Sequence, residues 1–249
     1  MRIYHYTKLD TLRLILSNTT IRLNRLDKMD DLTEGITYDF DSLANYFYVS
    51  SWSNNELENI PLWYMYTNEM KGVRVEADSN FLELEESTPD CRVLNIVKDD
   101  VIAYRLMYDN DDSFLCDVLY TDEQETCLPH PRGYISPNIL NVGSTKPRAW
   151  AFQSEVRFKL YGISKNDIAK YGDNLNQRVW NAMYAHKNNS CEYIDLKFDL
   201  TRLNNANFLL GPNSAESELI ELQNLIKEYL PDHHGEIGKS KLLIRYKQK

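Results

Sequence analysis

The sequence predicts an α+β fold with a mixed or antiparallel β-sheet core and flanking helices. Two observations predict it. Segments with the period-two alternation of strands outnumber segments with helical periodicity, and the two kinds do not alternate regularly, which argues against a doubly wound parallel sheet. No boundary divides the 249 residues, so we expect a single domain over 1–249 with one core.

The N-terminal elements are a short strand at 3–6 and a helix at 9–17. Leu12, Ile15 and Leu16 fall on one face of that helix and predict that it packs against the sheet. β-branched and aromatic residues, and breaks at Gly and Pro, predict the next elements. They are strands at 20–23, 46–53, 73–77, 92–97 and 101–106, and a helix that begins near Pro61 and ends at Gly72.

Residues 108–147 are the most loop-like part of the chain. They are acidic at first and then rich in Pro, Gly and Asn, so we expect a lid, a target-binding loop or a loop-rich insertion here. Regular patterns return after it. The predicted elements are a strand at 151–160, a helix at 175–186, a strand at 193–198, a helix from an Asn213 or Ser214 cap to Tyr229, and a strand at 241–246.

Composition and charge exclude several classes of protein. Hydrophobic residues make up 43% and charged residues 26%, which is typical of a folded globular protein. The net charge of −9 disfavours broad, sequence-blind binding of nucleic acid. No apolar run approaches the ~18 residues of a membrane span and no signal peptide opens the chain, so we expect a cytoplasmic protein with no membrane contact.

The sequence offers no pattern for a metal site. The four cysteines are scattered without a C-x-x-C pair, which argues against a zinc cage and a disulfide framework. The acidic run at 109–112 lacks the glycine and the glutamate of a calcium loop, because Phe114 and Tyr120 stand at those positions. We therefore expect no metal.

A positioned carboxylate is the first candidate for chemistry. Alternation over 151–160 puts Gln153, Glu155 and Arg157 on one face of the predicted strand, opposite Val156 and its apolar neighbours. The alternative is an ordinary solvated strand face, on which Glu155 pairs with Arg157 or Lys159.

Two earlier strands carry further candidates. His5 lies between two tyrosines immediately before a helix, and Ser51 and Ser53 share one face at the end of a strand, with Trp52 on the other. The alternatives are an ordinary half-buried histidine, serines that serve the turn after the strand, and a core tryptophan.

Together these three features resemble the three-part signature of ADP-ribosyltransferases. In that superfamily a first-strand His or Arg, a second-strand Ser or Tyr motif and a late-strand Glu surround NAD in the cleft of a split β-sheet. The matching blocks here are residues 4–7, 51–53 and 153–155. The signature is mixed, because His5 is typical of one branch whereas the serines are typical of another. The resemblance implies a split mixed/antiparallel sheet of ADP-ribosyltransferase type.

Over nearly its whole length the chain also resembles a family of uncharacterised bacterial proteins often encoded near phage-defence genes. That resemblance is carried by Tyr4-His5-Tyr6-Thr7, Arg25-Leu26-Asp27-Lys28 leading to Glu34-Gly35, Ser50-Ser51-Trp52-Ser53, Leu62-Trp63-Tyr64-Met65-Tyr66, the block from Trp150 to Phe158, and Ser240-Lys241. It implies a toxin-like enzyme in antiviral defence or in a toxin-antitoxin pair, with an antitoxin protein as a partner.

The resemblance implies NAD as the substrate and a macromolecular acceptor, with nucleic acid ahead of protein. Glu155 would stabilise positive charge on the ribose. The implied catalytic residues are Glu155, Gln153 and Arg25, and the implied NAD contacts are His5, Tyr6, Thr7, Arg22, Ser51, Trp52, Ser53 and Tyr66. Which of Arg22 and Arg25 contacts NAD stays open. The alternatives are a silent module that binds a nucleotide or phage signal, and a metal-free nuclease using His5 and Glu155.

Overall fold

The computed structural model describes residues 1–36, 43–87, 91–105, 107–108, 111–112, 114–122, 142–185 and 187–244. The predicted insertion at 108–147 falls largely outside these residues. Two short pairs of strands belong to its described part: β6 (Met107–Tyr108) with β7 (Asp111–Asp112), and β9 (Leu119–Tyr120) with β10 (Thr145–Lys146).

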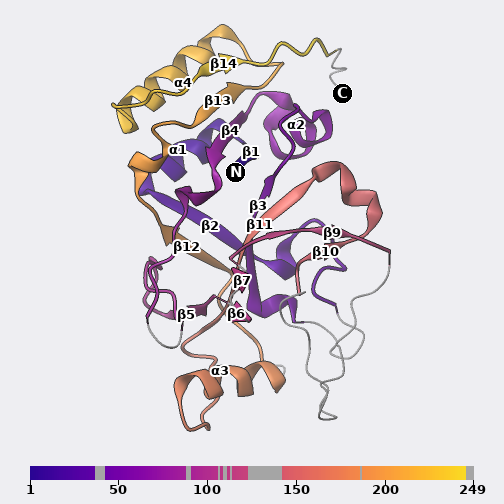
Figure 1. Cartoon of the computed structure of the whole chain (residues 1–249), viewed down its shortest axis with the longest axis vertical. Coiled ribbons are helices and arrows are strands. Elements are labelled where there is room, and N and C mark those ends of the chain that lie inside the picture. The colour runs from indigo at the N-terminus through magenta and orange to yellow at the C-terminus, as the bar shows by residue number, and fades with distance from the viewer. Residues whose placement is uncertain are drawn as a thin grey trace.

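A ten-stranded sheet runs through the centre of the molecule (Figure 1). Seven strands follow one path, in the order β12-β2-β3-β1-β4-β13-β14, while β11 pairs with β3, and β5 and β8 pair with β11. All these pairs are antiparallel except β13 with β14. The predicted α+β class with a mixed sheet is thus confirmed. The strands are β1 (Arg2–Thr7), β2 (Thr20–Arg25), β3 (Phe47–Ser53), β4 (Val73–Asp78), β5 (Val101–Tyr104), β8 (Leu115–Asp117), β11 (Glu155–Ser164), β12 (Tyr193–Lys197), β13 (Asn207–Leu210) and β14 (Ile237–Lys239).

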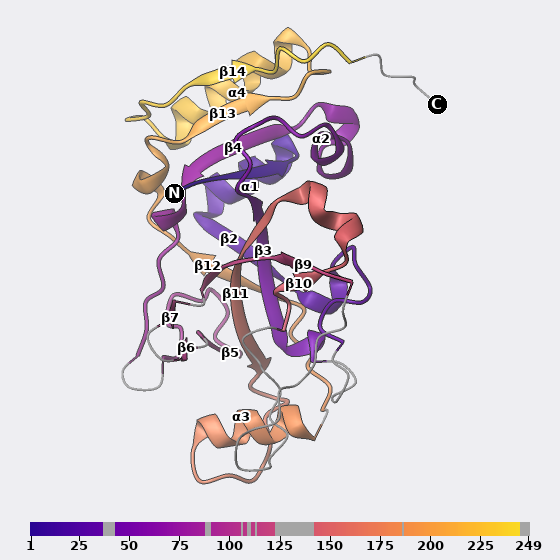
Figure 2. The same ribbon diagram turned by 45° about the vertical axis from the view of Figure 1, so that its right-hand side comes forward.

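Strand β3 changes partners along one of its edges. The beginning of β3 pairs with β2, through Tyr48 with Arg25 and Val49 with Asn24, whereas β1 pairs with it only at the other end, through Tyr4 with Ser53. Strands β1 and β2, which α1 (Leu9–Asn18) connects, therefore diverge beside the middle of β3 (Figure 2). The sheet is open at this point.

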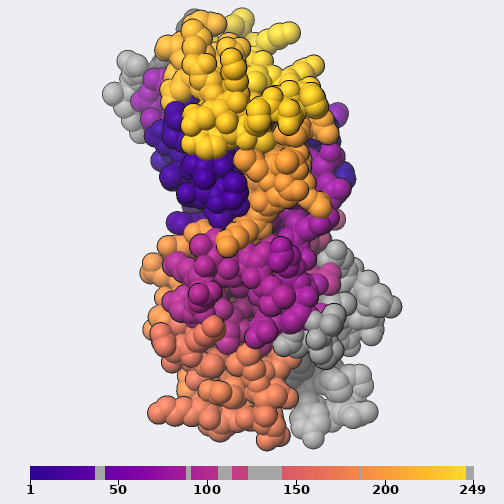
Figure 3. All heavy atoms as spheres, turned by 90° about the vertical axis from the view of Figure 1, so that its left-hand side faces the viewer, coloured from indigo at the N-terminus to yellow at the C-terminus, as the bar shows by residue number. Residues whose placement is uncertain are grey.

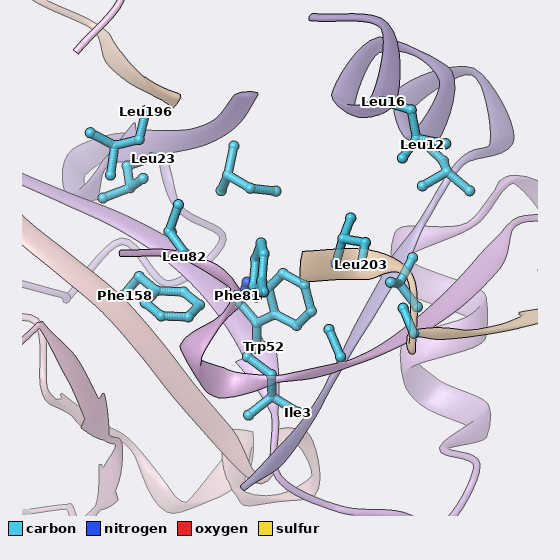
Figure 4. Packing of buried hydrophobic residues seen from close by; sticks show 14 of the residues in the cluster. Ile3, Leu12, Leu16, Leu23, Trp52, Phe81, Leu82, Phe158, Leu196 and Leu203 are labelled. Carbon is cyan, nitrogen blue, oxygen red and sulfur yellow. The ribbon is translucent and has the colours of Figure 1, made fainter. Parts of the chain in front are cut away.

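One face of the sheet packs against α1 and α4 (Glu216–Tyr229), which lie side by side in Figure 3. The Trp52 and Phe81 rings are 5.1 Å apart at the centre of this core, with Phe158 close to both (Figure 4). Leu12 of α1 and Leu225 of α4 are each 1% exposed. Burial of side chains of this size contributes about 1.5–3 kcal/mol each, which holds β1 and β3 firmly on this side.

The opposite face is covered in two places. Tyr4 and Tyr6 of β1 pack against Leu62 and Trp63 of α2 (Ile60–Tyr66). At the far end of the molecule, α3 (Leu175–Tyr184) packs against the last part of β11 (Figures 1 and 2). Between these two clusters the polar residues at the start of β11 face inward. This stretch of the sheet holds the candidate site.

Three predicted elements differ from the structure. The strand predicted at 151–160 begins only at Glu155, because a 3-10 helix (Arg148–Gln153) and Ser154, with φ 45°, precede it. Residues 92–97 make single bridges to three different segments, so no continuous ladder forms. Residues 241–244 form no strand, because the Leu242 amide bonds the Ser240 hydroxyl in a local turn, and residues 245–246 lie outside the described part.

Candidate functional site

A cavity of about 290 Å³ lies where β1 and β2 diverge. Residues 4–6 of β1 and 49–53 of β3 form two of its walls, and Lys146, Gln153 and Glu155 form a third. Segments about 50 and 100 residues apart in the sequence therefore meet around one space. A volume of this size is at the lower end of the range for small-molecule sites.

Most predicted site residues line this cavity. They are His5, Tyr6, Arg22, Ser51, Trp52, Ser53, Tyr66, Gln153 and Glu155. The structure does not bring Thr7 and Arg25 to it. Thr7 is buried at the end of β1, opposite Val73.

The two arginines left open by the sequence have different surroundings. The Arg25 guanidinium is buried, where it donates to the Asp27 carboxylate at 2.7 Å and to the carbonyl oxygens of Asn189 and Cys191. It therefore ties β2 to the segment before β12. Arg22 lines the cavity, and its guanidinium makes a two-point contact with Asp195, at 2.8 and 3.0 Å. Of the two, only Arg22 is placed to meet a ligand.

His5 is half-buried at the opening of the sheet. Its ring packs against Trp52 at 4.9 Å between centroids, and its Nδ1 donates to the carbonyl oxygen of Ser51 at 3.0 Å. Burial lowers the pKa of His5, and the bond to Ser51 opposes this only in part. The ring is therefore neutral near pH 7 with its hydrogen on Nδ1, which makes Nε2 an acceptor. Nε2 makes no hydrogen bond to the part of the chain that the structure describes.

The serine motif contains one bonded and one unbonded hydroxyl. The Ser53 hydroxyl donates to the Gln153 carbonyl oxygen at 2.8 Å and accepts from the Asn55 amide. The Ser51 Oγ is buried and has no hydrogen-bond partner within the described residues, although Ser51 lines the cavity. A buried hydroxyl without a partner costs free energy, so its position suits a ligand that completes the bond. Trp52 is only 4% exposed and supports His5 instead of presenting a free ring face.

Glu155 is the buried carboxylate of the cavity wall. Its Oε1 accepts from Arg157 Nε at 2.6 Å, and its Oε2 accepts from Lys146 Nζ at 2.7 Å. The pairing with Arg157 is the one that the alternative of an ordinary strand face predicted. That face is buried and not solvated, however, because Glu155 is 4% exposed. Lys159 instead donates to the Val142 carbonyl and the Ser144 hydroxyl.

The charge of Glu155 is set by two opposing effects. Burial alone raises the pKa of a carboxyl group, but the adjacent Arg157 and Lys146 cations and their hydrogen bonds outweigh burial here. The net result is a pKa of Glu155 below its ordinary value. Glu155 is therefore ionised at neutral pH, and each of its oxygens keeps a lone pair for a further donor.

A chain of hydrogen bonds continues from Glu155 along the wall. Lys146 Nζ also donates to Gln153 Oε1 at 2.8 Å, and Gln153 Nε2 donates to the Tyr66 hydroxyl at 2.7 Å. Tyr66 in turn donates to the Asp30 carboxylate at 2.9 Å. The side chain of Gln153 is thus held by partners at both ends.

Sequence reasoning missed two members of this network, Lys146 and Glu34. Glu34 bonds Arg157 through both of its oxygens and lies 3.2 Å from Lys146 Nζ. Glu34-Gly35 belongs to the blocks that carry the family resemblance, which was a usable signal. Lys146 lies near the end of the loop-like stretch 108–147, which has no periodic pattern, so nothing in the sequence pointed to it.

Comparison with protein-family models, with curated proteins and with solved structures finds no match to this chain. The resemblance to ADP-ribosyltransferases therefore stays a prediction. Among the described residues, no three His, Cys, Asp or Glu side chains gather as a metal site. No helix in the described ranges is long and apolar enough to cross a bilayer.

Proposed function

We propose that this cavity binds NAD and that the protein is an ADP-ribosyltransferase with a macromolecular acceptor. The observation that supports it most is the meeting of the three blocks, 4–6, 51–53 and 153–155, around one opening of the sheet. Considered one by one, most of these side chains also fit an ordinary structural role. Their shared cavity favours a common ligand.

The chemistry needs an ionised carboxylate beside a ribose. When the bond between nicotinamide and ribose C1′ breaks, its electron pair leaves with nicotinamide and positive charge develops on the ribose. Glu155 is charged and accepts a further hydrogen bond, so it would stabilise that charge through a ribose hydroxyl. The acceptor then forms a bond to C1′ and gives up its proton to water.

The remaining polar groups suit the other parts of NAD. The Ser51 hydroxyl would bond a ribose hydroxyl, and Nε2 of His5 would accept from another. Arg22 would bond a phosphate oxygen, in exchange for its contact with Asp195. Gln153 is held in place by Lys146 and Tyr66 and would orient the reacting ribose.

The acceptor is proposed as a nucleic acid or a protein. The aromatic-rich segment 52–66 would favour a nucleic acid if its rings were open to stack on bases, but Trp52 and Trp63 are buried and Tyr64 is the exposed aromatic residue of this segment. The net charge of −9 favours a protein acceptor.

The test uses purified protein, bacterial lysate and NAD labelled on its adenylate half, followed by separate nuclease and protease digestion. The proposal expects label on a macromolecule, and the digestion that releases it identifies the acceptor. Absence of both transferred label and free nicotinamide would contradict the proposal.

A second candidate is a module that binds NAD or a related nucleotide without consuming it. The specific observation in its favour is that both oxygens of Glu155 are already paired with a cation, Lys146 or Arg157. Tight binding of NAD that stays intact would identify this function. A toxin-like role in antiviral defence, with an antitoxin as partner, applies to either candidate and would show as growth arrest upon expression.

A further inference from the structure

Glu34 reaches the site from a tightly bonded turn. The Asp31 carboxylate accepts from the amide and the hydroxyl of Thr33, at 2.9 and 2.7 Å, and the Glu34 amide donates to the Asp31 carbonyl oxygen. Gly35 follows with φ 75°, where an added Cβ would lie 2.8 Å from the Ala44 side chain. The turn therefore fixes the direction in which Glu34 enters the interior.

Four buried side chains form a closed ring of alternating charge. Glu34 contacts Arg157 at 2.5 and 3.0 Å and Lys146 at 3.2 Å, while Glu155 contacts Arg157 at 2.6 Å and Lys146 at 2.7 Å. Each side chain is at most 3% exposed. Each cation thus serves both carboxylates, and the formal charge of the ring is zero.

Glu34 does not line the cavity, and its side chain is 0% exposed. It therefore has no direct route to a ligand. It does compete with Glu155 for the same two cations, and charges interact strongly there because all four side chains are buried. A change at Glu34 must therefore alter the pKa and the orientation of Glu155.

We infer that Glu34 is a positioning residue, which sets the orientation and the charge of Glu155 by sharing Lys146 and Arg157 with it. Its meaning for catalysis rests on the proposed function, but the coupling itself is measurable without NAD.

The sign of the coupling follows from the ring. Without Lys146, two carboxylates share the one charge of Arg157, so the pKa of Glu155 must rise. If Glu34 is then also neutralised, Glu155 has Arg157 to itself and its pKa must fall again. Among the described residues, the other ionisable groups that hydrogen bonds link to Glu155 are Tyr120, whose hydroxyl oxygen accepts from the Glu155 amide, and Tyr66 with Asp30 beyond Gln153. Burial raises the pKa of Tyr120 to about 12 and also raises the pKa of Tyr66. Both tyrosines therefore stay neutral during the titration.

The experiment is a titration of glutamate carboxyl groups followed by ¹³C NMR, with the Glu155 signal identified by its loss in Glu155→Gln. It compares the unmodified protein, Lys146→Met, and Lys146→Met with Glu34→Gln. We expect the Glu155 midpoint to rise by about one pH unit or more in Lys146→Met and to return by at least half of that rise in the double variant. Glu86→Gln in the Lys146→Met background is the matched control, because Glu86 makes a two-point pair with Arg105 away from the ring.

A Glu155 midpoint unchanged in Lys146→Met, or equally raised in the single and double variants, would overturn the inference. If Lys146→Met does not fold, Lys146→Gln keeps a donor toward Gln153 and replaces it throughout. Nicotinamide release from NAD in the presence of lysate, measured against pH in the same variants, separates the two proposals. Titrations that shift as expected with no release from any variant would reject the proposed function and leave the coupling in place.

Discussion

Lys146 Nζ lies 2.7 Å from Glu155 Oε2, so the carboxylate of the cavity carries a counter-cation from within the protein. This contact also links Glu155 to Gln153, which shares the same ammonium group. A ligand hydroxyl must therefore use one of the remaining lone pairs of Glu155 or move Lys146 aside.

We predict opposite effects of two serine substitutions. Ser51→Ala removes a buried hydroxyl without a bond to the described residues, so the thermal midpoint stays unchanged or rises, while NAD affinity falls about three- to ten-fold. Ser53→Ala removes bonds to Gln153 and Asn55 and lowers stability by about 1 kcal/mol. Thermal unfolding and calorimetric NAD binding test both. Unchanged affinity in Ser51→Ala would remove that hydroxyl from the ligand site.

The two arginines are expected to separate binding from stability. Arg22→Gln raises the KM for NAD about ten-fold with little loss of stability, because its pair with Asp195 is partly exposed. Arg25→Gln destabilises the protein by about 3 kcal/mol, since the Asn189 and Cys191 carbonyls lose a buried partner, and leaves KM unchanged. Steady-state kinetics and urea unfolding measure the two quantities. The reverse pattern would restore Arg25 as the NAD contact.

The burial of His5 should make the stability of the protein depend on pH. Burial lowers its pKa in the folded protein, so the unfolded chain binds more protons as the pH falls through the ordinary histidine range near 6.5. The contribution of His5 to stability is therefore full above that range and is lost as the pH falls below it. Unfolding of His5→Gln, compared with the unmodified protein at pH 7.5 and 5.5, should show a smaller loss in the variant. Equal losses would mean that His5 titrates normally.

Local patterns were sufficient for much of the fold. Strands β1 and β3 and helix α1 were predictable because aromatic, β-branched and periodic residues coincide within each segment. Strand β13 was missed because four residues, Asn207–Leu210, are too short for a pattern. The start of β11 was misplaced because Ser154 adopts a left-handed conformation that no residue pattern near it indicates.

The site was predictable only in its strand-borne parts. His5, Ser51 and Glu155 stand in motifs that can be compared between sequences, and the cavity brings them together. The ring partners Glu34 and Lys146 come from a turn and from a two-residue strand, and their role depends on contacts between distant segments. Ion pairs between segments so far apart in the sequence leave no periodic pattern from which they could be predicted.

The most direct measurement is nicotinamide release from NAD in the presence of lysate, by the unmodified protein, Glu155→Gln and Leu225→Ala. Breaking the contacts of Glu155 with Lys146 and Arg157 costs about 3–5 kcal/mol, so the core variant Leu225→Ala serves as a control of comparable instability far from the charge ring. With rates expressed per folded molecule, we expect release by the unmodified protein, a similar rate in Leu225→Ala, and a loss of about 100-fold or more in Glu155→Gln. Equal rates in all three, or bound NAD that none of them cleaves, would contradict the account.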